Sequence, residues 1–219
     1  MKFRKLKSLM LVSLLAWAGA AVAENKPVGI TPHMMEASVM HGDSTVAISR
    51  DQNNEAVVIP AFAKTSRPCP PFCIQPIVLA PGVETLGERE IINYLVRMKN
   101  GDDKVLVIDS RTPGWVEKGT IPGAVNIPWT ALNPAKGADP ISIADILEEQ
   151  FGAVSLEGLW DYSNAKTLVL FCNGMWCGQS PNNIKNLLKF GYPADRIKWY
   201  RGGMQNWSNL GLTTVKPAD

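Results

Sequence analysis

The chain has 219 residues, of which 46% are hydrophobic and 19% charged, and its formal net charge is +2. Its first 23 residues hold four of the 22 basic side chains and none of the 20 acidic ones, so 18 basic and 20 acidic side chains remain beyond them. That balance gives no reason to expect nucleic acid or an anionic membrane as a partner. The length suits one sizeable hydrophobic core, or one domain with an extension.

The amino terminus has the three parts of a secretory signal peptide. Basic residues lie within positions 1–7, an apolar run covers 9–21, and Ala21-Val22-Ala23 precedes Glu24. The apolar run is shorter than the roughly 18 to 20 residues that span a bilayer. We predict that residues 1–23 are a cleaved signal peptide, which makes the mature protein periplasmic or secreted and leaves it without a membrane anchor.

Residues 24–82 form an amino-terminal extension in this interpretation. Residues 24–40 lack clear periodicity and are expected to be a poorly ordered lead-in. Residues 44–48 and 56–59 flank a polar turn and predict a β-hairpin. The prolines of residues 67–76 predict a stiff, extended surface loop.

From residue 84 onward, helical and strand patterns alternate, which predicts an α/β fold with a central parallel β-sheet flanked by helices. Helices are expected at residues 87–98, 143–151, 182–190 and 204–210, and strands at 104–109, 124–128, 167–171 and 197–200.

The strand at 167–171 leads directly into Cys172. Ser180-Pro181 resembles a helix N-cap followed by proline at the first helical position. Cys172 is therefore expected in a strand-to-helix loop that faces unpaired N–H groups. Those donors and the positive end of the helix dipole favour a thiolate, so Cys172 is the candidate nucleophile.

Three segments resemble the rhodanese-like domain family in the same order: residues 107–128 with the turn Asp109-Ser110-Arg111, the Cys172 loop, and residues 191–212 with Arg201-Gly202-Gly203. The resemblance implies a three-layer rhodanese-like domain over residues 83–219. It also implies a sulfurtransferase that takes a sulfane sulfur from a small donor, holds it as a persulfide on Cys172, and passes it to a thiol or another nucleophilic acceptor.

The resemblance assigns roles to residues around Cys172. Asp109 and Arg111 match the family turn that braces the neighbourhood of the loop, and for both a role with substrate is an equal alternative to a purely structural ion pair. No cofactor or metal is implied. The residues expected to surround the thiolate, persulfide or substrate are Asn173, Gly174, Met175, Trp176, Gly178, Gln179 and Ser180.

The loop departs from the family pattern in its charge and length. It is longer than expected and has no arginine or lysine, and Thr120 stands where the family commonly has histidine. Arg196 is too distant for phosphatase or arsenate reductase chemistry. We therefore expect the thiolate to be stabilised by loop N–H groups and not by a Cys-His pair. If Met175 and Trp176 face the pocket, they would favour a bulkier or less polar acceptor over a small anion; packing is the alternative for both, as for Trp129.

All four cysteines follow the predicted cleavage site, and an oxidising compartment permits three disulfide pairings. A structural Cys69–Cys73 disulfide is favoured over a redox pair that resolves Cys172. Their spacing does not match the usual zinc knuckle, so a four-thiolate metal site is not expected.

Cys177 lies in the same loop as Cys172 and has three alternative roles: it resolves the persulfide with release of hydrogen sulfide, blocks Cys172 by a disulfide, or only packs. Two rivals to the sulfurtransferase follow. One is a thiol-disulfide oxidoreductase or redox-linked sulfur carrier that uses Cys172 and Cys177, with a periplasmic redox protein as partner. The other is a non-catalytic binding module with its thiols locked as disulfides.

Overall fold

The computed structural model describes residues 26–217, so the predicted signal peptide lies outside the described residues. A five-stranded sheet with strand order β3-β9-β8-β4-β5 forms the centre of the molecule, and each neighbouring pair is parallel. Its middle strand β8 is apolar and buried on both faces, as expected for a parallel sheet. The strands are β3 (Glu84–Leu86), β4 (Val105–Asp109), β5 (Val125–Asn126), β8 (Thr167–Phe171) and β9 (Ile197–Tyr200).

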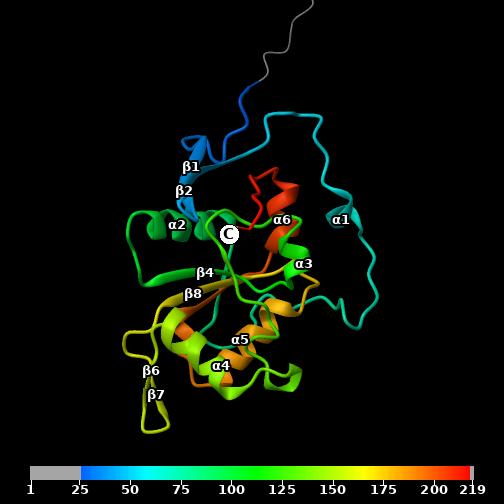
Figure 1. Cartoon of the computed structure of the whole chain (residues 1–219). Coiled ribbons are helices and arrows are strands. Elements are labelled where there is room, and N and C mark those ends of the chain that lie inside the picture. Colours follow the sequence, from blue (N-terminus) through cyan, green and yellow to red (C-terminus); the bar gives the residue numbers. More distant parts are fainter. Residues whose placement is uncertain (1–25, 218–219) are drawn as a thin grey trace, which may run out of the picture.

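Helices cover both faces of this sheet, which confirms the predicted three-layer rhodanese-like α/β fold (Figure 1). On one face, α2 (Glu88–Lys99) and α6 (Gly203–Asn209) contribute to a hydrophobic core that includes Ile91 and Trp207. On the other, α4 (Pro140–Asp145), the π-helical turn Ile146–Gln150 and α5 (Gln179–Lys189) pack against the opposite sheet face. Within the described residues, no helix is long and apolar enough to cross a bilayer.

An antiparallel hairpin is present in the extension, as predicted, but its residues differ from the predicted ones. Its strands are β1 (Glu36–His41) and β2 (Ser44–Ser49). The segment expected to be a poorly ordered lead-in thus supplies the first strand, because alternate residues Ala37 and Val39 are buried in the core that includes α2. Residues 56–59 are not a strand; they lead into the short helix α1 (Pro60–Ala63).

The strands expected at 167–171 and 197–200 are confirmed, and the expected helices are shifted at their ends. One of these shifts concerns the site, because the N-cap of α5 is Gly178 and not Ser180. Ser180 lies inside the helix and is buried. The sequence interpretation missed α3 (Pro113–Val116), the hairpin of β6 (Val154–Leu156) and β7 (Leu159–Asp161), the strand β3, and the 3₁₀ turns Pro134–Lys136 and Ala194–Arg196.

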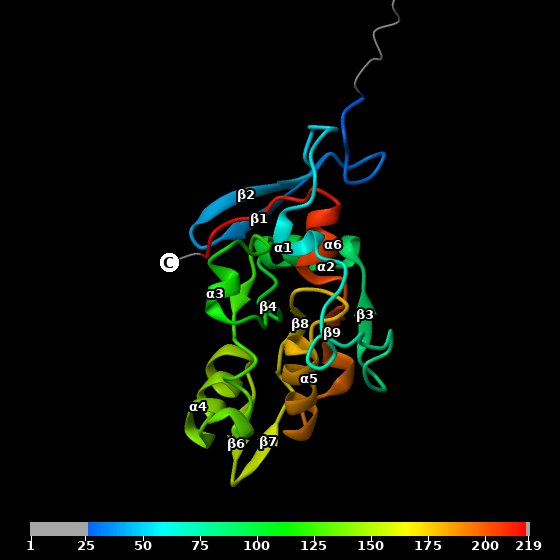
Figure 2. The ribbon, with the colours of Figure 1, turned by 90° about the vertical axis from the view of Figure 1, so that its right-hand side faces the viewer.

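The rest of the extension wraps around the domain. In Figure 2 it runs from the hairpin through α1, past α6, and across the edge of the molecule near α5 before it reaches β3. Hydrogen bonds fix two points of this path. The Gln205 side chain of α6 donates to the Phe62 carbonyl (3.2 Å), and the Gln75 amide donates to the Met175 carbonyl in the cysteine loop (2.8 Å). The extension therefore reaches the loop that carries the candidate nucleophile.

Candidate active site

Cys172 follows β8 directly, at the carboxyl end of the central strand. It is 2% exposed, Cys177 is 4% exposed, and both are free thiols. The start of α6 supports the loop from behind, since the Met204 amide donates to the Cys172 carbonyl at 3.0 Å. Gly203 comes so close that a Cβ there would lie 2.3 Å from the same oxygen. The strand and α6 together fix the position of the Cys172 backbone.

The Cys172 sulfur lies among hydrogen-bond donors. The Ser180 hydroxyl donates to it at 3.1 Å, and the Trp199 indole N–H donates to that hydroxyl oxygen at 3.1 Å, which orients it. Burial by itself raises the pKa of Cys172. Hydrogen bonds from the Cys177 thiol, from Ser180 and from the Gly174 amide outweigh burial and lower the pKa to about 7. A substantial fraction of Cys172 is therefore thiolate at neutral pH.

Cys177 behaves in the opposite way. Its burial and the neighbouring Cys172 raise its pKa well above the usual value, so it remains a protonated donor. When Cys172 is itself protonated, it donates to the Cys177 carbonyl at 3.5 Å. The two thiols thus differ in their ionisation: the pKa of Cys172 is lowered, whereas the pKa of Cys177 is raised.

A cavity of about 340 Å³ opens beside this pair, and Cys177 is the cysteine among its lining residues. The cysteine loop and α5 supply one side. Of the predicted loop residues, Asn173, Trp176, Gly178 and Gln179 line the cavity. Gly174 and Ser180 instead donate to Cys172, and Met175 is partly exposed outside the lining. The remaining lining residues are Pro71, Phe72, Trp115, Trp129 and Asn182.

Asp109 and Arg111 form a buried ion pair, with each side chain 1% exposed and 2.6 Å between Asp109 Oδ2 and Arg111 Nη2. Arg111 Nη1 also donates to Asn173 Oδ1 at 3.4 Å, which connects the pair to the cysteine loop. Thr120 donates its hydroxyl hydrogen to Asp109 Oδ2 at 2.8 Å, so the residue in the place of the family histidine supports the carboxylate. The buried ion pair is therefore joined by hydrogen bonds to both Thr120 and the cysteine loop.

The sequence interpretation missed the contribution of the extension to the cavity. Cys69 and Cys73 are joined in a disulfide, with Cα atoms 4.7 Å apart. We call residues 69–73 the disulfide loop. Phe72 packs edge-on against Trp176, with ring centroids 5.6 Å apart, and the Arg67 guanidinium lies 3.9 Å from the Trp176 ring centroid. No local pattern marks these contacts, because the partners are far apart in the sequence.

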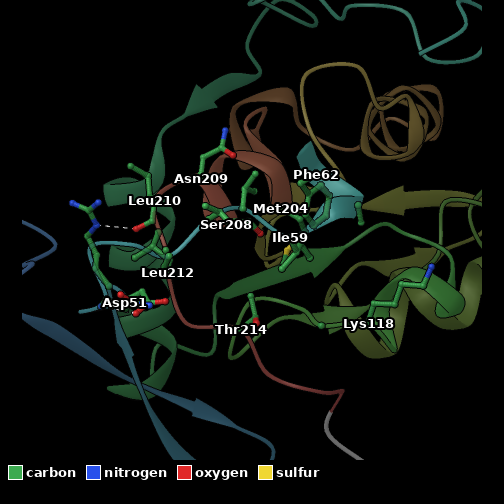
Figure 3. Close-up of a pocket in the computed structure, with 18 of the residues that line it drawn as sticks. Asp51, Ile59, Phe62, Lys118, Met204, Ser208, Asn209, Leu210, Leu212 and Thr214 are labelled. Atoms are coloured by element: carbon green, nitrogen blue, oxygen red, sulfur yellow. Dashed lines mark hydrogen bonds between the residues drawn. The ribbon is translucent and has the colours of Figure 1, made fainter. Parts of the chain in front are cut away.

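A second cavity, of about 450 Å³, lies between the extension and α6 (Figure 3). Its labelled walls include Ile59 and Phe62 of the extension and Met204 and Leu212 from the carboxyl-terminal part. No cysteine is among its lining residues, so it is separate from the thiol chemistry. Trp115 lines both cavities and stacks on Phe62, with ring centroids 6.2 Å apart.

One family model matches the sequence of this chain. The sequence model of the rhodanese-like domain family matches residues 92–210. No curated protein matches the chain.

Solved structures are similar to part of the chain at low identity. A human single-domain sulfurtransferase is 22% identical, with a TM-score of 0.38, over 57% of this chain and 95% of its own. A single-domain sulfurtransferase from Saccharomyces cerevisiae is 18% identical, with a TM-score of 0.39, over 57% and 88%. A thiosulfate sulfurtransferase from Pseudomonas aeruginosa is 16% identical, with a TM-score of 0.41, over 62% of this chain and 21% of its own.

Proposed function

Because the chain belongs to the rhodanese-like domain family, we propose that it is a sulfurtransferase that carries a sulfane sulfur as a persulfide on Cys172. The observation that carries this proposal is the group of donors around the Cys172 sulfur, which lowers its pKa to about 7. We further propose export to an oxidising compartment, which the Cys69–Cys73 disulfide supports.

Two displacements make up the reaction. The Cys172 thiolate attacks the outer sulfur of a small donor, the donor's S–S bond breaks, and the rest of the donor leaves with the electron pair. An acceptor thiolate then attacks the outer sulfur of the persulfide, and Cys172 leaves as a thiolate. Ser180, the Gly174 amide and the Cys177 thiol stabilise that leaving thiolate, so the same donors assist both steps.

Intact-mass measurement tests the proposal. The reduced protein is incubated with thiosulfate or with inorganic polysulfide and weighed before and after a thiol acceptor is added. We expect the wild type to gain one sulfur and to lose it to the acceptor, and Cys172→Ser to gain none. An adduct that survives in Cys172→Ser, or none in the wild type with either donor, would contradict the proposal.

A second candidate function is a sulfide-releasing dithiol cycle, which the presence of two free thiols in one loop favours, with the Cys172 sulfur 3.5 Å from the Cys177 carbonyl. In this cycle the Cys177 sulfur attacks the inner sulfur of the Cys172 persulfide and the persulfide S–S bond breaks. The Cys177 proton passes to the departing hydrosulfide, hydrogen sulfide leaves, and a Cys172–Cys177 disulfide forms. An external dithiol, such as a periplasmic redox protein, must then reduce that disulfide.

The persulfide form distinguishes this cycle from simple transfer. Loaded with sulfur and left without acceptor, the wild type should release sulfide and lose two hydrogens relative to the reduced protein, whereas Cys177→Ser should keep its persulfide. A wild-type persulfide that is equally stable would exclude the cycle. The third alternative, a binding module with locked thiols, is disfavoured because Cys172 and Cys177 are free.

A further inference from the structure

The extension, and not the rhodanese-like domain alone, completes the cavity beside the two thiols. We propose that the disulfide loop is the specificity wall of this enzyme, and that Phe72 selects an organic acceptor thiol with an apolar or aromatic group near its sulfur. This inference rests on the proposed sulfurtransferase function and names the substrate class for that same cavity.

The disulfide loop is held on the cysteine loop from several sides. Its own chain turns back where the Phe72 amide donates to the Pro68 carbonyl at 2.9 Å, and the Cys69–Cys73 disulfide closes that turn. Just beyond it, the Gln75 amide donates to the Met175 carbonyl. The Arg201 guanidinium donates to the carbonyls of Gln75 at 2.8 Å and Pro76 at 3.0 Å. Phe72 is therefore a fixed part of the cavity wall.

Two tryptophans of the lining are fixed as well. Trp176, against which Phe72 packs, donates its indole N–H to Gln205 Oε1 of α6 at 2.6 Å. Trp115 is held by its stacking on Phe62 of α1. Aromatic side chains so held form a rigid apolar surface that loses little conformational entropy when a ligand binds.

The chemistry of the lining indicates the substrate class. Four aromatic rings and a proline are accompanied by the neutral amides of Asn173, Gln179 and Asn182, and no charged side chain is among the lining residues. A volume of about 340 Å³ falls within the roughly 300–1,000 Å³ usual for pockets that bind organic ligands. A small dianion would leave most of this apolar wall without contact, whereas an acceptor with a ring would cover it.

Positive charge near the cavity does not overturn this assignment. Three cations lie over its tryptophans: Arg67 over Trp176 at 3.9 Å, Lys118 over Trp115 at 4.8 Å, and Lys136 over Trp129 at 5.8 Å. None of them is among the lining residues. Their field attracts small and organic anions alike, so discrimination between acceptors is left to the aromatic wall.

Single-turnover sulfur transfer tests the inference. Cys172 is first loaded with sulfur from inorganic polysulfide, intact mass verifies the persulfide, and transfer rates to phenylethanethiol and to propanethiol are compared. We expect the wild type to prefer phenylethanethiol by about tenfold, and Phe72→Ala to reduce that ratio by about three- to tenfold, because an aromatic contact is lost. Phe72→Leu, which keeps an apolar side chain in the wall, should give an intermediate ratio.

Leu159→Ala is the matched control, because Leu159 is 75% exposed on the β6–β7 hairpin and is not a lining residue of the cavity; its ratio should equal that of the wild type. A wild-type ratio near one would overturn the inference. So would a Phe72→Ala variant that slows both acceptors equally. Failure to load the persulfide would instead refute the proposed function, so the two failures are distinguishable.

Discussion

The sulfur of Cys172 receives a hydrogen bond from the Ser180 hydroxyl at 3.1 Å, and Trp199 fixes that hydroxyl by donating to its oxygen. Burial of the thiol raises its pKa. Hydrogen bonds from the Cys177 thiol, from Ser180 and from the Gly174 amide lower the pKa by more than burial raises it. No basic side chain is needed for this result, because oriented N–H, O–H and S–H groups supply the stabilisation. This explains how a loop without arginine or lysine still favours a thiolate.

Ser180→Ala tests that account at the residue scale. A hydrogen bond to a charged group contributes about 1.5–3 kcal/mol, so its loss should raise the pKa of Cys172 by about one to two units. The thiolate is the reactive form and exists above the pKa, so alkylation of Cys172 by iodoacetamide should slow about 5- to 50-fold at pH 7 and recover at higher pH. Peptide mass spectrometry across a pH series gives the midpoint.

The control for this variant is Ser155→Ala, at an exposed position of β6. It should keep the wild-type midpoint near pH 7. A midpoint unchanged in Ser180→Ala would mean that the serine hydroxyl does not stabilise the thiolate.

At the scale of elements, the reactive loop depends on the close approach of α6 to the end of β8. The first two amides after Gly203 donate to the carbonyls of Cys172 (3.0 Å) and Asn173 (2.9 Å), so the helix start pairs with the loop backbone. Gly203 has a φ of +55°, in the left-handed region, and has no room for a side chain. The glycine is required both by backbone conformation and by this contact.

Gly203→Ala should therefore lower the free energy of unfolding by at least about 2 kcal/mol, from left-handed strain and overpacking together. It should also displace the Cys172 carbonyl and reduce sulfur transfer more than a loss of folded protein explains. Urea unfolding and the rate of persulfide formation measure the two effects. Gly114→Ala is the comparison, since nothing lies within 4 Å of a Cβ there. Equal stability of the two variants would refute the argument.

The whole molecule is a rhodanese-like domain enclosed on one side by its own extension. The hairpin packs on α2, Phe62 packs on Trp115, and the disulfide loop packs on Trp176. Because Phe72 of the disulfide loop and Trp176 of the cysteine loop line the same cavity, the extension and the domain build that cavity together. The Cys69–Cys73 disulfide keeps that wall in place.

Removal of the disulfide should loosen the wall locally. In the Cys69→Ser/Cys73→Ser double variant, the opened loop has more conformational entropy, so the free energy of local opening falls by about 2 kcal/mol. This change corresponds to roughly 30-fold faster hydrogen exchange at the Gln75 amide. The Asp51 amide, which donates to the Gly211 carbonyl at 2.7 Å elsewhere in the extension, is the internal control and should exchange at the wild-type rate. Equal acceleration at both amides would indicate global destabilisation, and no change at Gln75 would contradict a role for the disulfide.

Features that depend on neighbouring residues could be predicted from the sequence. The apolar run before Cys172 predicted β8, helical spacing predicted α2, and the Asp109–Arg111 turn and the Gly202-Gly203 segment predicted the family. Cys172 could be proposed as the nucleophile because its position after a buried strand is a local property. In contrast, the N-cap assigned to Ser180 was wrong, since the helix begins earlier and turns that hydroxyl toward the sulfur.

The way in which distant segments complete the cavity could not be predicted from the sequence and is seen only in the folded chain. The place of Phe72 beside Trp176, the Arg67 guanidinium over the same ring, and the strand at Glu36–His41 depend on contacts between residues far apart in the chain. Periodicity and capping report on a few consecutive residues and carry no information about such contacts. The position of Cys172 directly after a strand could therefore be predicted from the sequence, whereas the shape of the cavity beside it depends on long-range packing.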